Sequence, residues 1–366
     1  MKKYIRDAVK ELRNSDKLVV EIPLKHKNDY KRNILSFFYN KSILTLQMKM
    51  VPCKLKNIIL KTTGLNVGYD ACVPHDIYID PYFPELIYFG KGCIVGGESK
   101  IYSHLVKDNK LILGKCVIEE RTLMGGVSKL LPGSVITKNS ILMFFSTLDK
   151  RMPEGTLYGG EPAKEVMKFS KEDIQKYFDP SNGKHKEYYN KFKNEVRAFM
   201  KDPNKNFFKM HYDGNRLNAG NDWWRARNIF RIFWNGIIIE FTRILNPSWF
   251  KNLLYKIVGM KIGKNVKVGK GVVFDHIYCD TISIEDDVEV GDYAYFDGHE
   301  YTISQTLFGK ILLKRGCRIG KYSYVRIGTI VGENSIIEPN SMAQRIIPPN
   351  EIWGGMPFAK FIKKND

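Results

Sequence analysis

The chain has 366 residues, enough for two domains that each bury a core, and with 43% apolar and 27% charged residues it is globular rather than disordered. Six cysteines without a CxxC motif indicate buried thiols in a reducing compartment, and MKKYIRDAVKEL lacks the apolar core of a signal peptide, so we expect a cytoplasmic protein. A net charge of +19 favours an acidic partner, such as an anionic membrane surface, a phosphorylated cofactor or nucleic acid, whereas no uncharged apolar run reaches the ~18 residues of a membrane span.

Residues 1–54 are predicted to be an N-terminal extension with amphipathic helices. The segment KRNILSFFYNKSILTLQMKMVPCKLKNIIL, at 31–60, is aromatic, basic and helix-like. Such a helix can lie in a membrane interface, or it can pack against its own domain or a neighbouring subunit. The sequence leaves both alternatives open.

Residues 55–168 repeat every six positions. Large apolar residues recur at that step, and a small residue stands two places before most of them. The large set is Val67, Val73, Ile79, Ile112, Ile118, Met124, Leu130, Ile136 and Leu142, and the small set is Cys116, Thr122, Ser128, Ser134 and Ser140. A period of six fits neither an α-helix nor an alternating strand. It predicts a coil with three short flat sides per turn, in which one large side chain per side points inward.

Residues 169–225 are predicted to be a helical linker, because KEDIQKYF and KEYYNKFKNEVRAFM are charged and have helical periodicity. An amphipathic helix is predicted over 226–249. It lies within an aromatic, basic stretch, 223–258, that corresponds to 31–60 of the first half.

Residues 250–366 repeat the first coil and end in a C-terminal tail. FKNLLYKIVGMKIG at 250–263 corresponds to LKNIILKTTGLNVG at 55–68, and WGGMP at 353–357 to YGGEP at 158–162, always 195 residues apart. The large residues are now Ile262, Val268, Phe274, Leu313, Ile319, Val325, Val331 and Ile337, with small partners Cys317, Ser323, Thr329 and Ser335. We therefore predict an all-β solenoid, made of two tandem parallel β-helices with flanking amphipathic helices.

This pattern resembles that of the hexapeptide-repeat acyltransferases, over about residues 55–168 and 250–362. GGEPAK at 159–164, and GGMPFAK at 354–360 with one extra residue, are similar to the family's usual end, where the coil gives way to a helix. The second half is closest in pattern to the C-terminal repeats of Pls-type (poly-lysine-synthetase-like) peptide synthetases and to polysaccharide O-acetyltransferases. The resemblance implies left-handed β-helices and transfer of an acyl group, most simply acetyl, from acyl-CoA to a hydroxyl or an amine.

His104 and His299 stand at the same point of the two halves, 195 residues apart. The six-residue step breaks around each of them, after Ile101 and again after Phe296, so each histidine is expected to begin an inserted loop of about five residues. A lone histidine is usually a surface or hydrogen-bonding residue. In the resembling family, however, a histidine here is the general base that takes the acceptor's proton, which implies that role for His299 first and for His104 second.

An imidazole base needs a group that orients it. Asp80 and Asp275 match across the halves, each about one rung before the inserted loop, whereas Asp297 and Glu300 flank His299 with no acidic match in the first half. We predict Asp275 as the orienting acid, with Glu300 as the next candidate. A solvated carboxylate is the alternative for both.

Lys115 and Lys310 also match, each after a glycine, and are candidates to bind a CoA phosphate or the substrate, although a solvated lysine is the default. We also assign the closing residues of the two coils to the cofactor site. They are Gly159, Gly160, Lys164, Gly354 and Gly355.

Other chemistries fit poorly. A hexapeptide carbonic anhydrase needs three zinc-binding histidines, and the histidines here are too scattered, so no metal is expected. The chain has no GxxxxGK[ST] or GxGxxG phosphate loop, and no motif supports nucleic-acid binding. A non-catalytic tandem scaffold, and an amide-forming transferase with a non-CoA thioester donor, remain the alternatives.

We therefore predict a CoA-dependent acyltransferase with a small-molecule or glycan acceptor. The resemblance also implies a homo-oligomer, with a trimer favoured, whose sites lie in grooves between neighbouring coils. The basic, aromatic helices favour peripheral contact with an anionic membrane, which would place the protein at the inner face of the membrane.

Overall fold

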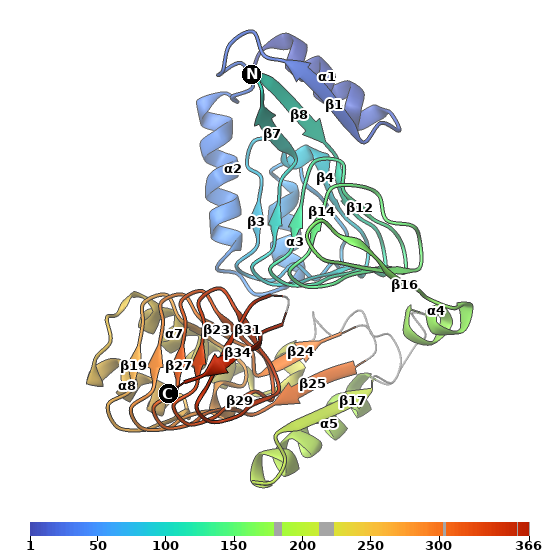
Figure 1. Cartoon of the computed structure of the whole chain (residues 1–366). Helices are drawn as coiled ribbons and strands as arrows, with labels where there is room; N and C mark the ends of the chain where they lie inside the picture. The colour runs from blue at the N-terminus through green and yellow to red at the C-terminus, as the bar shows by residue number, and fades with distance from the viewer. Residues whose placement is uncertain (179–184, 212–222, 303–304, 357, 366) are drawn as a thin grey trace. The chain divides into compact units, whose positions relative to one another are not determined.

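Figure 1 shows the computed structural model of the chain, which describes residues 1–178, 185–211, 223–302, 305–356 and 358–365. The chain divides into two compact units. One is Met1–Ser181 with Asn215–Asn221, and the other is Asn182–Gly214 with Asp222–Asp366.

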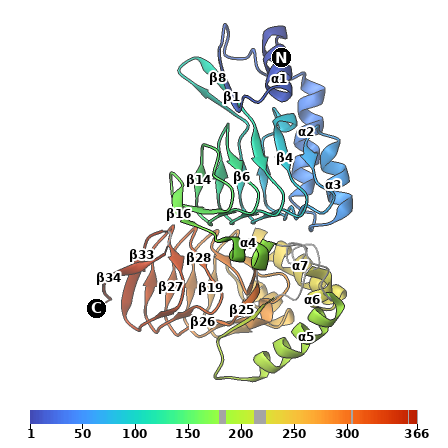
Figure 2. The same ribbon diagram turned by 90° about the vertical axis from the view of Figure 1, so that its right-hand side faces the viewer.

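The first unit contains a three-sided coil of short parallel strands, as the six-residue period predicts. One side holds β2 (Asn66–Val67), β4 (Ile87–Phe89), β9 (Cys116–Ile118) and β12 (Val135–Ile136); the next holds β3 (Tyr78–Ile79), β6 (Lys100–Ile101), β11 (Lys129–Leu130) and β14 (Thr147–Leu148). The third holds β5 (Ile94–Val95), β10 (Leu123–Met124), β13 (Ile141–Leu142) and β15 (Thr156–Gly159). Figure 2 shows the turns stacked one on another.

Small buried side chains at the corners bond to the neighbouring turn. The Ser128 hydroxyl donates to the carbonyl of Met143 at 3.0 Å, and the Ser134 hydroxyl donates to the carbonyl of Leu148 at 2.6 Å. Both serines are fully buried, so these bonds satisfy groups that would otherwise be costly to remove from water. This explains why the sequence places small polar residues two positions before the large inward ones.

An arm leaves this coil at His104. It is a three-stranded sheet of β7 (His104–Lys107), β8 (Lys110–Gly114) and the upstream strand β1 (Val19–Pro23), and it packs against α1 (Lys3–Asn14). The expected inserted loop is therefore a β-hairpin.

The hairpin overturns one predicted core position, Ile112. Because side chains alternate along a strand, Leu111 and Leu113 face the α1 core and are fully buried, while Ile112 is only partly buried. The inward series resumes at Ile118. In the second unit it likewise resumes at Leu313 rather than at the equivalent Leu307, which lies in the second hairpin.

Two helices cover the start of the first coil, α2 (Ile34–Gln47) and α3 (Lys54–Lys61). Asn33 caps α2 by accepting a hydrogen bond from the backbone N–H of Leu35. The buried Lys56 donates to the carbonyls of Met50 at 3.0 Å and Pro74 at 2.6 Å, which ties the helix pair to the coil.

The coil ends in an antiparallel strand, and the helix expected from GGEPAK is displaced. Gly160, at φ +98°, reverses the chain so that β16 (Lys164–Lys168) pairs back onto β15, and α4 (Lys171–Phe178) begins only afterwards. In the second unit Gly355, at φ +107°, makes the same reversal into β34 (Lys360–Lys364).

The second unit contains the corresponding three-sided coil. One side holds β18 (Lys261–Ile262), β21 (Ile282–Ile284), β26 (Ile311–Leu313), β29 (Ile330–Val331) and β32 (Ile346–Ile347). The next holds β19 (Lys267–Val268), β22 (Glu289–Val290), β27 (Arg318–Ile319), β30 (Ile336–Ile337) and β33 (Glu351–Gly354). The third holds β20 (Val273–Phe274), β23 (Tyr295–Phe296), β28 (Tyr324–Val325) and β31 (Met342–Ala343). The helices that directly precede this coil in the sequence are α6 (Trp223–Ala226), α7 (Ile229–Ile244) and α8 (Trp249–Ile257).

The second coil also carries an arm, formed by β24 (His299–Tyr301), β25 (Gln305–Gly309) and β17 (Phe207–His211) beside α5 (His185–Lys201). The prediction of a purely helical linker over 169–225 is therefore wrong, because β17 of this segment pairs with β25. The duplication therefore includes the upstream strands β1 and β17, which pair with equivalent hairpins: Val19 with Gly114 and Phe207 with Gly309. A comparison of the sequence at the constant offset of 195 does not align these two strands, because they are 188 residues apart.

Replacing Ile319 with Asp should unfold the second coil. Ile319 is 2% exposed and points inward, where a carboxylate has neither water nor a cation, so we expect a loss of stability on the order of 3–5 kcal/mol. The matched change Ile346→Asp, at a side chain 67% exposed, should shift Tm by no more than about 2 °C. Thermal unfolding followed by circular dichroism measures both, and equal shifts would contradict the inward assignment.

Candidate active site

The stacking of parallel strands brings Asp275 and His299 together. β20 and β23 pair in register, Val273 with Tyr295 and Phe274 with Phe296. Asp275 follows β20 and His299 follows β23 closely, so the two side chains lie on adjacent turns at one corner. His299 Nδ1 and Asp275 Oδ2 are 2.5 Å apart.

Asp275 is buried, and its hydrogen bonds stabilise it as an ionised carboxylate. Its oxygens also accept hydrogen bonds from the backbone N–H groups of Ile277, Tyr278 and Gly298, each at 2.8 Å. Burial alone would raise the pKa of Asp275, but the pairing with His299 and these backbone donors outweigh it and hold the pKa at about 2.

His299 is oriented and made more basic by its neighbours. Burial tends to lower its pKa, but Asp275, followed by Asp297 and Glu300, favours the protonated ring, and the net shift is upward. Because Nδ1 is engaged with Asp275, Nε2 is the ring nitrogen that can exchange a proton with a substrate. The His299 side chain keeps 16% of its surface exposed.

The first coil carries the equivalent pair. His104 Nδ1 bonds Asp80, which also accepts hydrogen bonds from the backbone N–H of Tyr82 and the hydroxyl of Ser103, both at 2.9 Å. Aromatic rings lie near both histidines. Those of Tyr30, Tyr82 and Phe83 have centroids 5.1–5.5 Å from that of His104, and those of Tyr278 and Tyr301 have centroids 5.5 and 5.0 Å from that of His299.

Glu300, the second candidate for the orienting acid, pairs with Arg326, whereas Asp275 pairs with His299. Its carboxylate accepts two hydrogen bonds from the Arg326 guanidinium, at 2.6 and 2.7 Å. Asp297, beside it, accepts a hydrogen bond from the Tyr324 hydroxyl, and burial, together with Asp275, raises the pKa of Asp297 to about 7.

Tyr324 and Arg326 were not singled out in the sequence. A signal for them exists in the stacking register, because β28 follows β23 on the same side of the coil and pairs Tyr324 with Tyr295. A residue at the Asp297 position therefore has Arg326 on the next turn.

The two matched lysines contact the arms rather than an open surface. Lys115 Nζ donates to the carbonyl of Ser15 and Lys310 Nζ to the carbonyl of Asp202, both at 2.5 Å. Each lysine thus ties the segment between the upstream helix and strand to its hairpin. This is a structural contact, and a role in binding CoA remains a prediction.

The closing residues lie at the last turn of each coil, away in sequence from the turns that carry the histidines. Gly159 and Lys164 pair with each other at the reversal of β15 into β16, and Gly354 pairs with Lys360 at the reversal of β33 into β34. Gly160 and Gly355 make these reversals at positive φ. These contacts reverse the chain, and the assignment of the five residues to a cofactor site stays a prediction.

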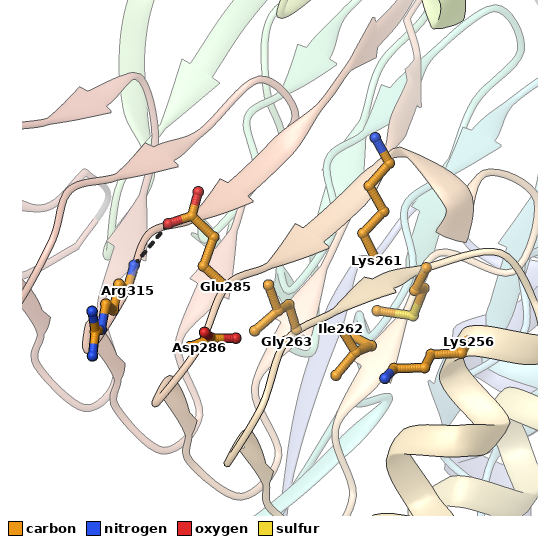
Figure 3. Close-up of a pocket in the computed structure, with 9 residues that line it drawn as sticks. Lys256, Lys261, Ile262, Gly263, Glu285, Asp286 and Arg315 are labelled. Carbon is orange, nitrogen blue, oxygen red and sulfur yellow. Dashed lines mark hydrogen bonds between the residues drawn. The ribbon is translucent and has the colours of Figure 1, made fainter.

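A surface cleft of about 560 Å³ lies at the start of the second coil (Figure 3). Lys256, Lys261 and Arg315 contribute its basic side chains, and Glu285 and Asp286 its acidic ones. Neither residue of the His299–Asp275 pair lines it, and the two carboxylates offset the cations. Within the described ranges of the chain, no group of three or more His, Cys, Asp or Glu side chains could hold a metal ion.

Comparisons with known proteins agree with the resemblance predicted from the repeats. No protein-family model matches the chain. The "Putative acetyltransferase YvoF" of Bacillus subtilis (strain 168) is 23% identical over 158 residues, which cover 42% of this chain and 92% of YvoF. The delta-poly-L-ornithine synthetase of Acinetobacter baumannii (strain AB307-0294) is 26% identical over 141 residues, 38% of this chain but only 10% of the synthetase.

A solved structure of the hexapeptide-repeat acetyltransferase VCA0836 from Vibrio cholerae matches 38% of this chain and 92% of its own, with 16% identity and a TM-score of 0.34. A likeness this weak adds no weight to the argument from sequence. The predicted recognition is confirmed by the sequence relatives, of which one is named as a putative acetyltransferase and the other as a delta-poly-L-ornithine synthetase.

The contact with Asp275 predicts a raised pKa for His299, which can be measured. In the intact protein His299 should titrate above the ordinary histidine value of about 6.5, and Asp275→Asn should lower its pKa, because the largest favourable charge is removed. The raised pKa also means that the stability contributed by protonation of His299 is complete below about pH 6.5 and is lost as the pH rises through the folded pKa.

Imidazole NMR signals, followed against pH, measure this shift. Asp80→Asn, which removes the equivalent carboxylate from the first coil, is the matched control and should leave the His299 titration unchanged. A His299 titration that is identical in wild type and Asp275→Asn would contradict the pairing.

Proposed function

We propose that the protein is a CoA-dependent acyltransferase, most simply an acetyltransferase, in which His299 is the general base and Asp275 orients it. The observation that carries the proposal is the buried Asp275 carboxylate on Nδ1 of a partly exposed histidine, at the base of an arm that leaves the coil. The sequence relative named as a putative acetyltransferase supports the acyl-transfer chemistry.

The step follows from this geometry. Nε2 of His299 takes the proton from the acceptor's O–H or N–H group while the acceptor attacks the thioester carbonyl of acyl-CoA. The new C–O or C–N bond forms, the C–S bond breaks, and the imidazolium returns the proton to the departing sulfur. Asp275 stabilises the imidazolium that forms in between. Backbone N–H groups of the coil are the simplest donors to the oxyanion.

We further propose two tandem left-handed β-helices and a homotrimer with sites in grooves between coils, on the strength of the family resemblance. The acceptor is a small molecule or a glycan, and acetyl-CoA or another acyl-CoA is the co-substrate.

Loss of the general base is the direct test of this function. We expect His299→Ala to lower the turnover of acetyl-CoA by ~10²–10⁴-fold, whereas His104→Ala should have a small effect, because Asp297 and Glu300 favour protonation of His299 and have no acidic counterpart beside His104. Thiol release from acetyl-CoA, with folding checked by circular dichroism, is the measurement.

The two variants also decide the role of each coil. Full activity in His299→Ala beside an inactive His104→Ala would show that the first coil is the catalytic one. Absence of acetyl-CoA turnover in the wild type with every acceptor would favour the alternative, a non-catalytic scaffold.

We also propose that the paired helices bind an anionic membrane surface at the inner face of the membrane, in the cytoplasm. None of the described helices is long and apolar enough to cross a bilayer. Yet α7 and α8 turn large side chains outward: Phe230, Phe233, Trp234, Ile237, Phe241, Ile244, Trp249, Phe250, Leu253 and Ile257 are all exposed. The matching region of the first half, 31–61, has seven Lys or Arg and no Asp or Glu. The exposed apolar side chains of the second unit and the basic composition of the corresponding segment of the first unit each favour contact with anionic lipid.

Sedimentation with lipid vesicles tests this surface. The wild type should bind vesicles that contain phosphatidylserine more tightly than purely zwitterionic ones, and Phe230→Asp with Trp249→Asp should weaken binding at least ~10-fold. Ile346→Asp, which removes an exposed apolar side chain from β32 of the coil, is the matched control. Binding that is equal in all three proteins would rule out this surface.

A further inference from the structure

The second coil carries a polar cluster that the first coil lacks, although both have the histidine–aspartate pair. The cluster consists of Asp297 and Glu300, from the turn that carries His299, and Tyr324 and Arg326 from the next turn. At the offset of 195 the first coil has Tyr102 for Asp297, Leu105 for Glu300, Lys129 for Tyr324 and Leu131 for Arg326. The shared histidine pair therefore does not require this cluster, which serves something particular to the second coil.

One carboxylate of the cluster, Asp297, forms no ion pair with a described side chain, although the charges of His299 and Arg326 act on it. Glu300 is neutralised by the two hydrogen bonds from Arg326, and Asp275 by His299. Asp297 accepts a hydrogen bond from the neutral hydroxyl of Tyr324, and no cation among the described side chains forms an ion pair with it. Its pKa of about 7 has burial as the first cause and Asp275 as the second, the expected behaviour of a carboxylate that lacks a cation.

The charge near Asp297 favours a cationic ligand. With Asp297 ionised, three carboxylates (Asp275, Asp297 and Glu300) face two cations, Arg326 and the protonated His299, so this cluster carries a net negative charge although the whole chain carries a net charge of +19. An ammonium group would pair with Asp297, whereas a neutral hydroxyl would leave that carboxylate uncompensated.

We propose that the second coil acylates a primary amine, whose ammonium form is recognised by Asp297 beside His299. This inference rests on the proposed function and specifies its acceptor. Asp297 is here a substrate-binding residue and His299 the base.

The reaction balances with one proton released. The bound ammonium gives its first proton to solvent and becomes a nucleophilic amine. As its nitrogen attacks the thioester carbonyl, His299 Nε2 takes the second proton, the C–N bond forms and the C–S bond breaks. The imidazolium then protonates the CoA thiolate, so the products are an amide, CoA thiol and one proton.

A purely structural role is the competing explanation. The Tyr324–Asp297 hydrogen bond could serve only to tie two turns of the coil together. A structural contact would affect all acceptors equally when it is removed, whereas a binding carboxylate changes the preference between amines and hydroxyls.

Matched acceptors separate the two explanations. We would assay the full chain with acetyl-CoA and two pairs that differ only in the reacting groups, 1,4-diaminobutane against 1,4-butanediol and D-glucosamine against D-glucose. Thiol release and product mass are the readouts. We expect acetamide products, with the hydroxyl member of each pair at least ~100-fold slower, because a site that binds a charged group rejects the analogue that lacks it.

Asp297→Asn keeps the size of the side chain and removes its charge. We expect KM for the amine to rise about 10- to 100-fold and the amine-to-hydroxyl ratio of kcat/KM to fall by a similar factor. Glu289→Gln, which removes a carboxylate from β22 on another side of the coil, is the matched control and should leave the ratio unchanged.

A second readout does not depend on turnover. Binding of an ammonium beside Asp297 should lower the pKa of His299 in an NMR titration with 1,4-diaminobutane, and 1,4-butanediol should not, because only a cation opposes protonation of the ring.

Each outcome is decisive. Preference for hydroxyl acceptors, or an amine-to-hydroxyl ratio that Asp297→Asn leaves unchanged, would overturn the amine proposal while acyl transfer stands. A His299 titration that is insensitive to the diamine would also overturn it. Absence of thiol release with every acceptor would overturn the proposed function, and this inference with it.

Discussion

The carboxylate of Asp275 and the imidazole of His299 meet only because two short parallel strands, β20 and β23, stack in strict register. A slip of one residue would turn the inward side chains outward, so the buried apolar positions fix the register of each turn. The same register then places polar residues of neighbouring turns side by side at a corner. The stability of the core and the geometry of the site therefore have one physical origin.

The arms show how the coil obtains a place for chemistry. A regular turn offers only short flat sides, whereas the hairpin that begins at each histidine interrupts it, and an upstream strand and helix support the hairpin. Lys115 and Lys310 fasten that upstream segment through backbone carbonyls. The histidine thus lies at a junction between a rigid scaffold and a variable loop, where functional side chains are commonly found.

The duplication provides an internal comparison. Both halves keep the histidine, its aspartate and the lysine that holds the arm, and aromatic rings lie near both histidines, but Asp297 and Glu300 flank His299 and have no acidic counterpart beside His104. Two copies of one scaffold can therefore carry different electrostatics at the same geometric point. This difference favours the second coil as the catalytic one and gives its acceptor a chemical character.

The sequence by itself determined the three-sided coil in each half, because one large and one small residue every six positions is a requirement of packing inside the turn. It also identified both histidines and the matching of Asp80 with Asp275, since a duplicated position is visible without coordinates. The tertiary structure alone decided what the inserted segments become. Ile112 lies in a hairpin because β1 pairs with β8, and that pairing depends on a strand about ninety residues upstream. The links of Asp297 to Tyr324 and of Glu300 to Arg326 were likewise decided there, because they join different turns, and stacking between turns leaves only a weak trace in the order of residues along the chain.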